Sequence, residues 1–274
     1  MAAGEEPSPG AGQGQMWAAG EAYEPYVGRW SRLVAVEFLK GLGVPAGGRW
    51  LDVGCGTGAL SGAILDRCAP ASVIGVDPSE GFLVYARRRV ADPRAEFRQG
   101  DAQALPVGDA AVDVVVSGLV LNFVPEPVVA VREMARVVRP GGLVAAYVWD
   151  YAGRMELMRA FWDAAAAVHP DATDLDEGRR FPLCRPAPLT ALFTDAGLDH
   201  VRAHPIEIPT RFRDFDDYWT PFLGGQGPAP AYAMSLGEDH RAALREALRA
   251  RLPLAADGSI EMVARAWAVR GDRA

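Results

Sequence analysis

A glycine-rich segment is the part of this sequence best suited to hold a ligand. Residues 51–59 read LDVGCGTGA and begin with a short apolar run. Glycines at a strand-to-helix turn let the backbone approach a ligand closely, and the N–H groups that open the next helix attract negative charge. Gly54, Gly56 and Ala59 also satisfy the dinucleotide fingerprint G-x-G-x-x-G/A. On this segment alone, a nicotinamide dinucleotide and another nucleoside ligand are both open.

Three carboxylates stand where they would surround such a ligand. Asp77 ends the second apolar run and suits a ribose diol in either case. Asp52 directly precedes the glycines, where a carboxylate can meet an ammonium group but would repel a pyrophosphate. Asp101 follows the third apolar run and offers an acceptor to an adenine amino group. Together the three acids favour a zwitterionic or cationic nucleoside over a dinucleotide.

Alternating strand and helix patterns must position these residues. Repeated strand–helix units imply an α/β fold with a parallel sheet covered on both faces. We expect strands at 50–53, 73–77, 95–98 (near an edge), 112–116 and 143–148, with helices at 59–68, 81–90 and 128–138. Further along we expect helices at 155–168 and 189–196 and closing strands at 201–208 and 260–269.

The same patterns suggest one domain preceded by a tail. Residues 1–16 are rich in Gly, Pro, Ala and Glu and are expected to be a disordered tail, and 17–274 form the domain. Within it we expect a helical lid at 17–48, the ligand-binding core at 49–150 and a substrate-side half at 151–274. A cap insertion at 209–252 would hold an aromatic segment, a Gly/Pro loop and a charged helix from Glu238.

Composition excludes several classes of protein. Half of the residues are apolar, as in a soluble globular protein, but no stretch reaches the roughly 20 apolar residues that span a bilayer. The net charge is −7 and the longest basic run is Arg87–Arg89, so we expect no nucleic-acid partner and no membrane partner. Cys55, Cys68 and Cys184 fit neither a disulfide framework nor a zinc pattern. We therefore expect a cytoplasmic protein without a metal site.

Lysine usage removes further enzyme classes. Lys40 is the only lysine in the sequence. A Walker A loop needs a lysine after its last glycine, which rules out a P-loop nucleotidase. The same shortage excludes a Tyr-x-x-x-Lys dehydrogenase pair and argues against a Schiff-base lysine.

Over residues 23–270 the sequence resembles class I S-adenosylmethionine (SAM)-dependent methyltransferases. The segments that carry the resemblance are LDVGCGTG at 51–58, VDPS at 76–79, GDAQALP at 100–106 and RPGG at 139–142. It is most similar to the small-molecule branch that includes ubiquinone- and menaquinone-biosynthesis enzymes. The resemblance implies a Rossmann-like, seven-stranded, mostly parallel sheet with an antiparallel last strand at 260–269. Helices would cover both faces, with a small helical cap.

The resemblance also implies SAM as cofactor, S-adenosylhomocysteine (SAH) as product, and a role for individual residues. The methionine end falls to Asp52, Gly54, Cys55 (through its backbone), Gly56, Gly58, Ser117, Gly118 and Leu119; the ribose to Asp77; and the adenine to Pro78, Ser79, Asp101 and Ala102. Arg29 and Arg32 are candidates for the methionine carboxylate, because an arginine fork suits that partner. The alternative is that both arginines lie on the surface beside the start of a helix.

The acceptor side is less well defined. Many relatives carry a histidine after the fourth strand, whereas residues 119–125 read LVLNFVP. Asn122 in that segment cannot act as a base; it would orient a substrate or cap the local turn. The segment also lacks the Asn/Asp-Pro-Pro-aromatic signature of enzymes that methylate amides and nucleobase amines. The weak catalytic candidates are Asn122, Asp150 and His169, and the last two are the candidates for a base because both follow the fifth strand. The predicted substrate contacts are Tyr26, Trp30, Asn122, Phe123, Trp149, Trp219 and Phe222, with core packing as the alternative for the aromatic ones.

These observations predict metal-independent SN2 transfer of the SAM methyl group to a small molecule. Oxygen, nitrogen and carbon acceptors all stay open, and the protein would be a monomer or a homodimer. One alternative is a protein that binds SAM without methyl transfer, and another is an NAD(P)-dependent oxidoreductase. A macromolecular acceptor fits the acidic charge less well.

Overall fold

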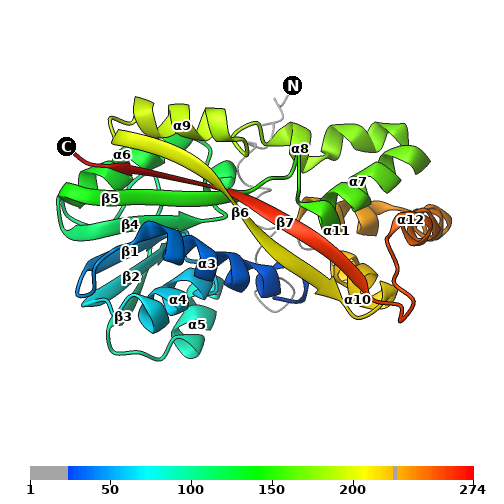
Figure 1. Ribbon diagram of the computed structural model, residues 1–274, viewed down its shortest axis with the longest axis horizontal. Helices are drawn as coiled ribbons and strands as arrows, with labels where there is room; N and C mark the ends of the chain where they lie inside the picture. Colours follow the sequence, from blue (N-terminus) through cyan, green and yellow to red (C-terminus); the bar gives the residue numbers. More distant parts are fainter. Residues whose placement is uncertain (1–23, 225–226) are drawn as a thin grey trace, which may run out of the picture.

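The computed structural model describes residues 24–224 and 227–274. The tail expected at 1–16 and the first part of the lid expected at 17–48 lie outside these residues. The described chain contains one seven-stranded sheet in the order β3-β2-β1-β4-β5-β7-β6 (Figure 1). The strands are β1 Arg49–Val53, β2 Ser72–Asp77, β3 Ala95–Gln99, β4 Val112–Gly118, β5 Val138–Trp149, β6 Asp199–Phe212 and β7 Ile260–Asp272.

The direction of the strands agrees with the predicted fold. Neighbours among β1 to β5 pair in parallel, whereas β7 is antiparallel to both β5 and β6. The antiparallel last strand is therefore confirmed, and β3 is an edge strand as expected. Dinucleotide-binding sheets have the order 3-2-1-4-5-6 without an antiparallel strand inserted before the sixth. The observed topology thus departs from that of nicotinamide enzymes.

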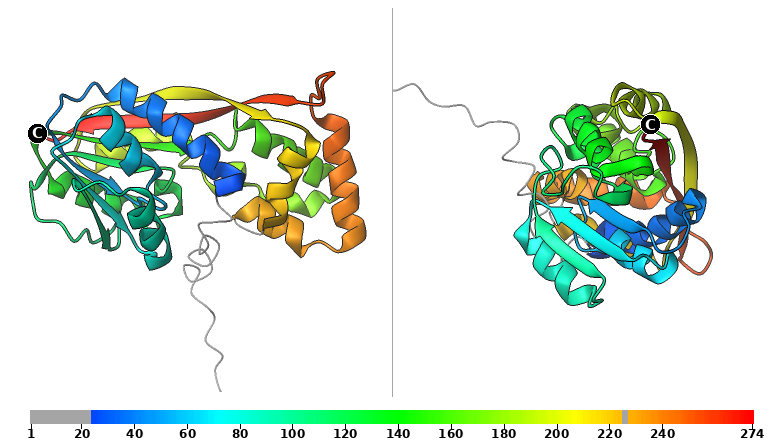
Figure 2. Two further views of the ribbon diagram at one scale, coloured as in Figure 1. Left: turned by 90° about the horizontal axis from the view of Figure 1, so that it is seen from below. Right: turned by 90° about the vertical axis from the view of Figure 1, so that its left-hand side faces the viewer.

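Helices cover both faces of the sheet, which is why its central strands read as nearly continuous apolar runs. Val115 and Val116 of β4, for example, are completely buried. One group of helices consists of α3 Arg29–Leu42, α4 Ala59–Arg67 and α5 Glu80–Arg89, and the other of α6 Pro127–Val137 and α9 Pro186–Asp195 (Figure 2). The carboxyl ends of the parallel strands are left between these layers, at one edge of the sheet.

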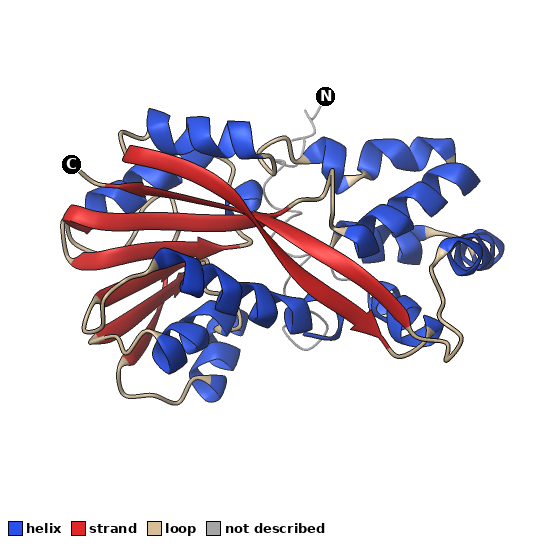
Figure 3. Cartoon of the chain, in the orientation of Figure 1, coloured by secondary structure: helices blue, strands red, loops and turns tan. Residues whose placement is uncertain are grey.

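Most of the remaining helices lie beside a two-stranded arm, apart from the two groups that cover the sheet. Pairing of β5 with β7 ends at Trp149↔Ala266, but β6 and β7 stay paired as far as Phe212↔Ile260. These two strands therefore project past the sheet (Figure 3). We call the helices beside this arm the helical lobe: α7 Glu156–Val168, α8 Glu177–Arg180, α10 Phe215–Trp219, α11 Pro228–Ser235, α12 Glu238–Arg251, η3 Pro170–Leu175 and η4 Thr220–Gly224. None of the helices in the described ranges is long and apolar enough to cross a membrane.

Several boundaries differ from the expected ones. The RPGG segment at 139–142 lies inside β5 rather than before it. Residues 209–212 continue the ladder of β6, so the inserted helices begin after Phe212 instead of at 209. Residues 228–235 form α11 where a Gly/Pro loop was expected. Pro228 fits this helix because the first helical position needs no N–H partner.

A buried acid lies inside the helical lobe. Glu177 is 1% exposed, and its carboxylate accepts a hydrogen bond from Trp162 Nε1. Within the described chain it forms no ion pair. Burial therefore raises the pKa of Glu177 from 4.5 to about 7. The folded protein holds this proton more tightly than the unfolded chain does.

This pKa shift predicts a loss of stability with rising pH. Between about pH 4.5 and pH 7 the unfolded chain gives up the proton before the folded protein does, so the free energy of unfolding should fall. The contribution of Glu177 is at most about 3 kcal/mol. Glu177→Gln keeps an oxygen for Trp162 and should flatten the decline, as measured by urea unfolding at about pH 5 and about pH 8. Glu246→Gln, an exposed control on α12, should leave it unchanged. Parallel declines in the wild type and Glu177→Gln would contradict the assignment.

Candidate cofactor and acceptor site

The turn after β1 forms an open backbone cradle. The N–H groups of Gly54 and Cys55 both donate to the carbonyl oxygen of Val76, at 2.7 and 3.0 Å, and so tie the turn to the end of β2. Gly54, Gly56 and Gly58 have φ angles of +72°, +51° and +80°, a region that favours glycine. A Cβ atom at Gly56 would meet no atom within 4 Å. The turn therefore presents an open side at Gly56, where a ligand would reach its backbone.

Asp77 is held rigidly beside this open side. One carboxylate oxygen accepts the N–H of Gly56 and the other accepts the N–H of Ser79, each at 2.9 Å. Burial raises the pKa of Asp77, and the two hydrogen bonds act in the opposite direction. A carboxylate has about four acceptor positions. The two that remain are fixed in place for donors of a ligand.

Asp52 lies beneath the same turn and has an unused oxygen. Its Oδ2 accepts a hydrogen bond of 2.7 Å from Ser61 Oγ, but its buried Oδ1 has no hydrogen-bond partner. Burial raises the pKa of Asp52 to about 7, and the negative charge of Asp77 adds to the rise. An unsatisfied buried acceptor costs about 1–3 kcal/mol. A cationic group of a ligand would satisfy it, so the chemistry of this site fits the predicted cofactor.

The residues predicted to surround an adenine lie at the ends of β2 and β3. These ends are adjacent because Asp77 pairs with Gln99. Asp101 is exposed in the following loop and accepts the N–H of Gln103 at 2.8 Å. Ser79 caps α5, where its Oγ accepts the N–H of Phe82 at 3.4 Å. Pro78 is exposed and Ala102 is half-buried at the same edge. The structure thus brings the predicted ribose and adenine residues together.

The end of β4 has a constrained backbone. Ser117 is buried, and its hydroxyl donates to the carbonyl of Val53 at 2.8 Å, so it binds β1. Leu119 has a φ of +64°, which is rare for a residue with a side chain, and its N–H donates to the carbonyl of Tyr147 at 2.7 Å. A Cβ atom at Gly118 would lie 2.6 Å from Tyr147 Oη. These contacts direct the chain into the short helix η2 Leu121–Phe123.

The residues of η2 face the helical lobe. Asn122 and Phe123 are half-buried, and the Asn122 amide nitrogen has no hydrogen-bond partner. The ring of Phe123 meets that of Phe181 edge-on, at 5.1 Å between centroids. Phe181 follows α8 and also contacts Tyr151 after β5. Phe123 after β4, Tyr151 after β5 and Phe181 after α8 therefore lie together. We call this region the candidate acceptor side.

Neither weak candidate for a base is placed against the glycine turn. Asp150 Oδ2 accepts hydrogen bonds from Arg265 Nε, at 2.7 Å, and from the N–H of Arg154, and it forms an ion pair with Arg265 Nη2 at 2.6 Å. These donors hold Asp150 in an ion pair between β5 and β7. His169 follows α7 and packs against His240 of α12, with ring centroids 4.5 Å apart. In the described ranges no hydrogen bond, ion pair or ring contact joins Asp150 or His169 to the turn.

Most of the predicted aromatic contacts pack in the core. Phe222 is 1% exposed, stacks on Phe161 at 4.5 Å and meets Tyr26 edge-on at 5.4 Å. Trp30 packs edge-on against Phe212 at 5.5 Å, and Trp149 and Trp219 are buried too. These five side chains therefore agree with the alternative interpretation, packing in the core, rather than with contact to a substrate. Among the predicted substrate contacts, Asn122 and Phe123 alone are partly exposed.

Arg29, the first residue of α3, joins this helix to the helical lobe. Its guanidinium bonds Asp217 of α10 at 3.1 Å and lies over the rings of Trp30 and Phe212, at 4.5 and 4.7 Å. A methionine carboxylate would have to compete with Asp217 for this group. Arg32 is half-buried one turn further along α3. Recognition of a carboxylate by either arginine stays a prediction.

Comparison with known proteins finds similarity to methyltransferases. Residues 51–146, which contain the glycine turn, Asp77 and Asp101, match the model of the methyltransferase domain family. The match thus covers this part of the chain and agrees with the resemblance to SAM-dependent methyltransferases. Demethylmenaquinone methyltransferase of Staphylococcus aureus is 39% identical over 108 residues, which cover 39% of this chain and 45% of that protein. An uncharacterized 37.1 kDa protein in transposon TN4556 of Streptomyces fradiae is 33% identical over 135 residues, 48% of this chain and 36% of that protein. The chain thus matches less than half the length of these curated relatives.

Several solved structures share the fold over 85% or more of the chain. A protein of Anabaena variabilis, assigned by name to the methyltransferases of antibiotic biosynthesis, has a TM-score of 0.60 at 22% identity, over 85% of this chain and 95% of that one. Phosphoethanolamine N-methyltransferase 2 of Haemonchus contortus, solved with phosphomonomethylethanolamine and SAH, has a TM-score of 0.55 at 16% identity, over 88% and 52%. The [4+2]-cyclase SpnF has a TM-score of 0.51 at 20% identity, over 89% and 80%. At these identities the likeness concerns the fold alone.

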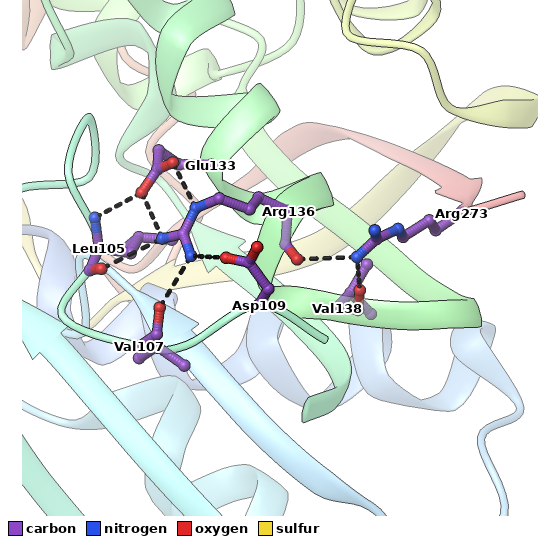
Figure 4. Close-up of polar contacts among 7 residues, drawn as sticks. All are labelled: Leu105, Val107, Asp109, Glu133, Arg136, Val138 and Arg273. Atoms are coloured by element: carbon purple, nitrogen blue, oxygen red, sulfur yellow. Dashed lines mark hydrogen bonds and ion pairs between the residues drawn. The ribbon is translucent and has the colours of Figure 1, made fainter. Parts of the chain in front are cut away.

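Sequence reasoning missed a polar cluster that holds the loop between β3 and β4, the loop that carries Asp101. Arg136 of α6 donates to Glu133, to Asp109 and to the carbonyls of Leu105 and Val107 (Figure 4). Arg273 in turn donates to the backbone carbonyls of Arg136 and Val138. The signal was the i,i+3 spacing of Glu133 and Arg136 on one helix face. That spacing does not show which loop the pair would bind.

The tight side of the cradle predicts the effect of Gly54→Ala. A Cβ atom there would lie 2.5 Å from Val120 Cγ1, on a backbone with φ of +72°. We expect Gly54→Ala to lower the free energy of unfolding by about 1–3 kcal/mol, measured by urea unfolding. A Cβ at Gly237 would meet nothing within 4 Å, so Gly237→Ala is the matched control with little expected effect. Equal midpoints for the two variants would show that the turn is looser than described.

Proposed function

We propose that this protein transfers the methyl group of SAM to a small-molecule acceptor. The observation that carries the proposal is the arrangement at the glycine turn. The unpartnered Asp52 Oδ1, the open backbone at Gly56 and the two spare acceptor positions of Asp77 lie together at the ends of β1 and β2. SAM has a group for each of these features: its ammonium group for Asp52 Oδ1, its methionine chain for the open backbone at Gly56, and its ribose diol for Asp77.

The chain's own residues would mainly bind and orient. Asp52 would accept from the ammonium group, Asp77 from the ribose hydroxyls, and Asp101 from the adenine amino group, with Ala102 contributing its N–H. Pro78 and Ser79 would flank the base. Bound SAM supplies a methyl group already activated by the sulfonium charge, so the protein's task is in-line alignment of the acceptor.

The acceptor side supports a small acceptor that needs little help with proton removal. Asn122 and Phe123 would contact it, and an amide in this place orients a substrate but takes no proton at neutral pH. Asp150 is held by Arg265. We therefore propose an acceptor that arrives with its nucleophilic atom already unprotonated. The aromatic rings of Phe123 and Phe181 suit a partly apolar molecule.

Methyl-labelled SAM tests the proposal. Incubation of the protein with labelled SAM and a metabolite extract should produce a labelled small molecule, detected by mass spectrometry. In Asp77→Ala the label should disappear, because hydrogen bonds to a charged group are worth about 1.5–3 kcal/mol, or about 10- to 100-fold in the Kd for SAH. Asp195→Ala, an exposed acid at the end of α9, is the matched control. Binding of SAH without any labelled product would instead favour a SAM-binding protein that does not methylate, and an unchanged Kd in Asp77→Ala would contradict the cofactor site.

The raised pKa of Asp52 makes a second prediction. Below about pH 7 this carboxyl is mostly protonated and cannot attract an ammonium group. The Kd for SAH, measured by calorimetry, should therefore fall by up to about tenfold per pH unit as pH rises from about 5 to 7. Asp52→Asn cannot ionise and should bind weakly with a flatter pH profile. Because Asp77 also has a raised pKa, the difference between the wild type and Asp52→Asn is the decisive quantity; identical profiles would exclude Asp52 as the partner of the ammonium group.

A further inference from the structure

The loop between β3 and β4 carries the adenine residues but has little structure of its own. We call residues 100–109 the adenine loop, since Asp101 and Ala102 belong to it. Its internal backbone hydrogen bonds close single turns, such as the one from the N–H of Ala104 to the carbonyl of Asp101 at 3.1 Å. An isolated bridge pairs these same two residues, and the loop joins no strand ladder. Something outside the loop must therefore fix the direction of the Asp101 carboxylate.

Helix α6 provides that support at the far side of the loop. The Arg136 guanidinium donates to Val107 O at 3.0 Å, Asp109 Oδ1 at 2.6 Å and Leu105 O at 3.3 Å, and it holds both Glu133 oxygens at 2.7 Å (Figure 4). Glu133 Oε2 accepts the N–H of Leu105 at 2.9 Å. Glu133 and Arg136 thus form hydrogen bonds with both the N–H and the carbonyl of Leu105. A planar guanidinium with five donors suits such a fixed arrangement, which a lysine could not reproduce.

The other end of α6 holds the near side of the loop. Gln103 Oε1 accepts the N–H of Glu126, directly before α6, at 3.0 Å. The N–H of Gln103 donates to Asp101 Oδ1. The loop is therefore fastened to both ends of one helix. Because Glu126 follows η2 closely, the same helix also begins at the acceptor segment.

The energetics indicate a local role for the pair. Arg136 and Glu133 side chains are 33% and 20% exposed, and the hydrogen bond from Arg136 lowers the pKa of Glu133, so the pair stays ionised near neutral pH. Ion pairs open to solvent add little to global stability. A loop that is already ordered, however, binds a ligand without the entropy cost of ordering at that moment.

We propose that Glu133 and Arg136 are positioning residues that set the adenine loop for recognition of the adenine amino group. This inference rests on the proposed function, because it takes Asp101 as the acceptor from that amino group. The pair does not touch the ligand; it holds Leu105 and Val107, and these fix the geometry of Asp101 and Ala102.

A ligand comparison separates this role from general stabilisation. SAH and S-inosylhomocysteine differ at the base, where the amino group of adenine is replaced by an oxo group. The wild type should bind SAH at least about tenfold more tightly by calorimetry, since only SAH presents an amino donor to Asp101. In Arg136→Gln and Glu133→Gln this preference should fall below about twofold, while urea unfolding midpoints stay close to that of the wild type. Arg136→Lys keeps the charge and should not restore the preference.

The controls make each outcome decisive. Arg132 is exposed on the same helix and forms no hydrogen bond or ion pair in the described ranges, so Arg132→Gln should keep the wild-type preference. A full preference in a folded Arg136→Gln or Glu133→Gln variant would overturn the positioning role. Equal binding of both ligands by the wild type would overturn it as well, because Asp101 would not read the amino group. If the wild type bound neither ligand, the proposed function itself would fail.

Discussion

The double hydrogen bond from Gly54 and Cys55 to the carbonyl of Val76 is the contact on which the site depends. It forces the chain after β1 to turn sharply across the end of β2, which is possible only with a left-handed backbone at Gly54. The same turn brings the N–H of Gly56 to Asp77 and leaves Asp52 buried beneath it. Two carboxylates with raised pKa values are thus held close together by backbone geometry, and neither forms an ion pair within the described residues.

Local pattern was enough to predict the fold of the half of the molecule that holds the candidate cofactor site. The glycine spacing, the acids at the strand ends and the strand–helix alternation lie within short stretches of sequence, and the structure places them as those stretches suggest. The partners of Arg29 and Asp150 could not be found in this way. Arg29 bonds Asp217, 188 residues away, and Asp150 bonds Arg265, 115 residues away, so no local spacing records either pair.

The aromatic residues of the helical lobe illustrate a different limit of sequence reasoning. Trp219 and Phe222 recur at helical spacing, and this pattern is the same for a side chain that packs in a core and for one that covers a substrate. Only the positions of Phe161 and Tyr26, from other parts of the chain, show that Phe222 is enclosed. Phe123 differs from these residues because it is only half-buried, at the end of β4 against Phe181, and its role as a substrate contact stays a prediction.

The place of β7 in the sheet has a consequence for how the molecule assembles. β6 has no sheet neighbour other than β7, so it cannot join the sheet until the chain has passed through α10, α11 and α12 and returned. Strands β1 to β5 pair among themselves and need no later segment to form the glycine turn. Pairings distant in sequence form late, because loop closure must come first. The half that holds the candidate cofactor site would therefore form first, and the candidate acceptor side would be enclosed last, when β7 pairs with both β5 and β6.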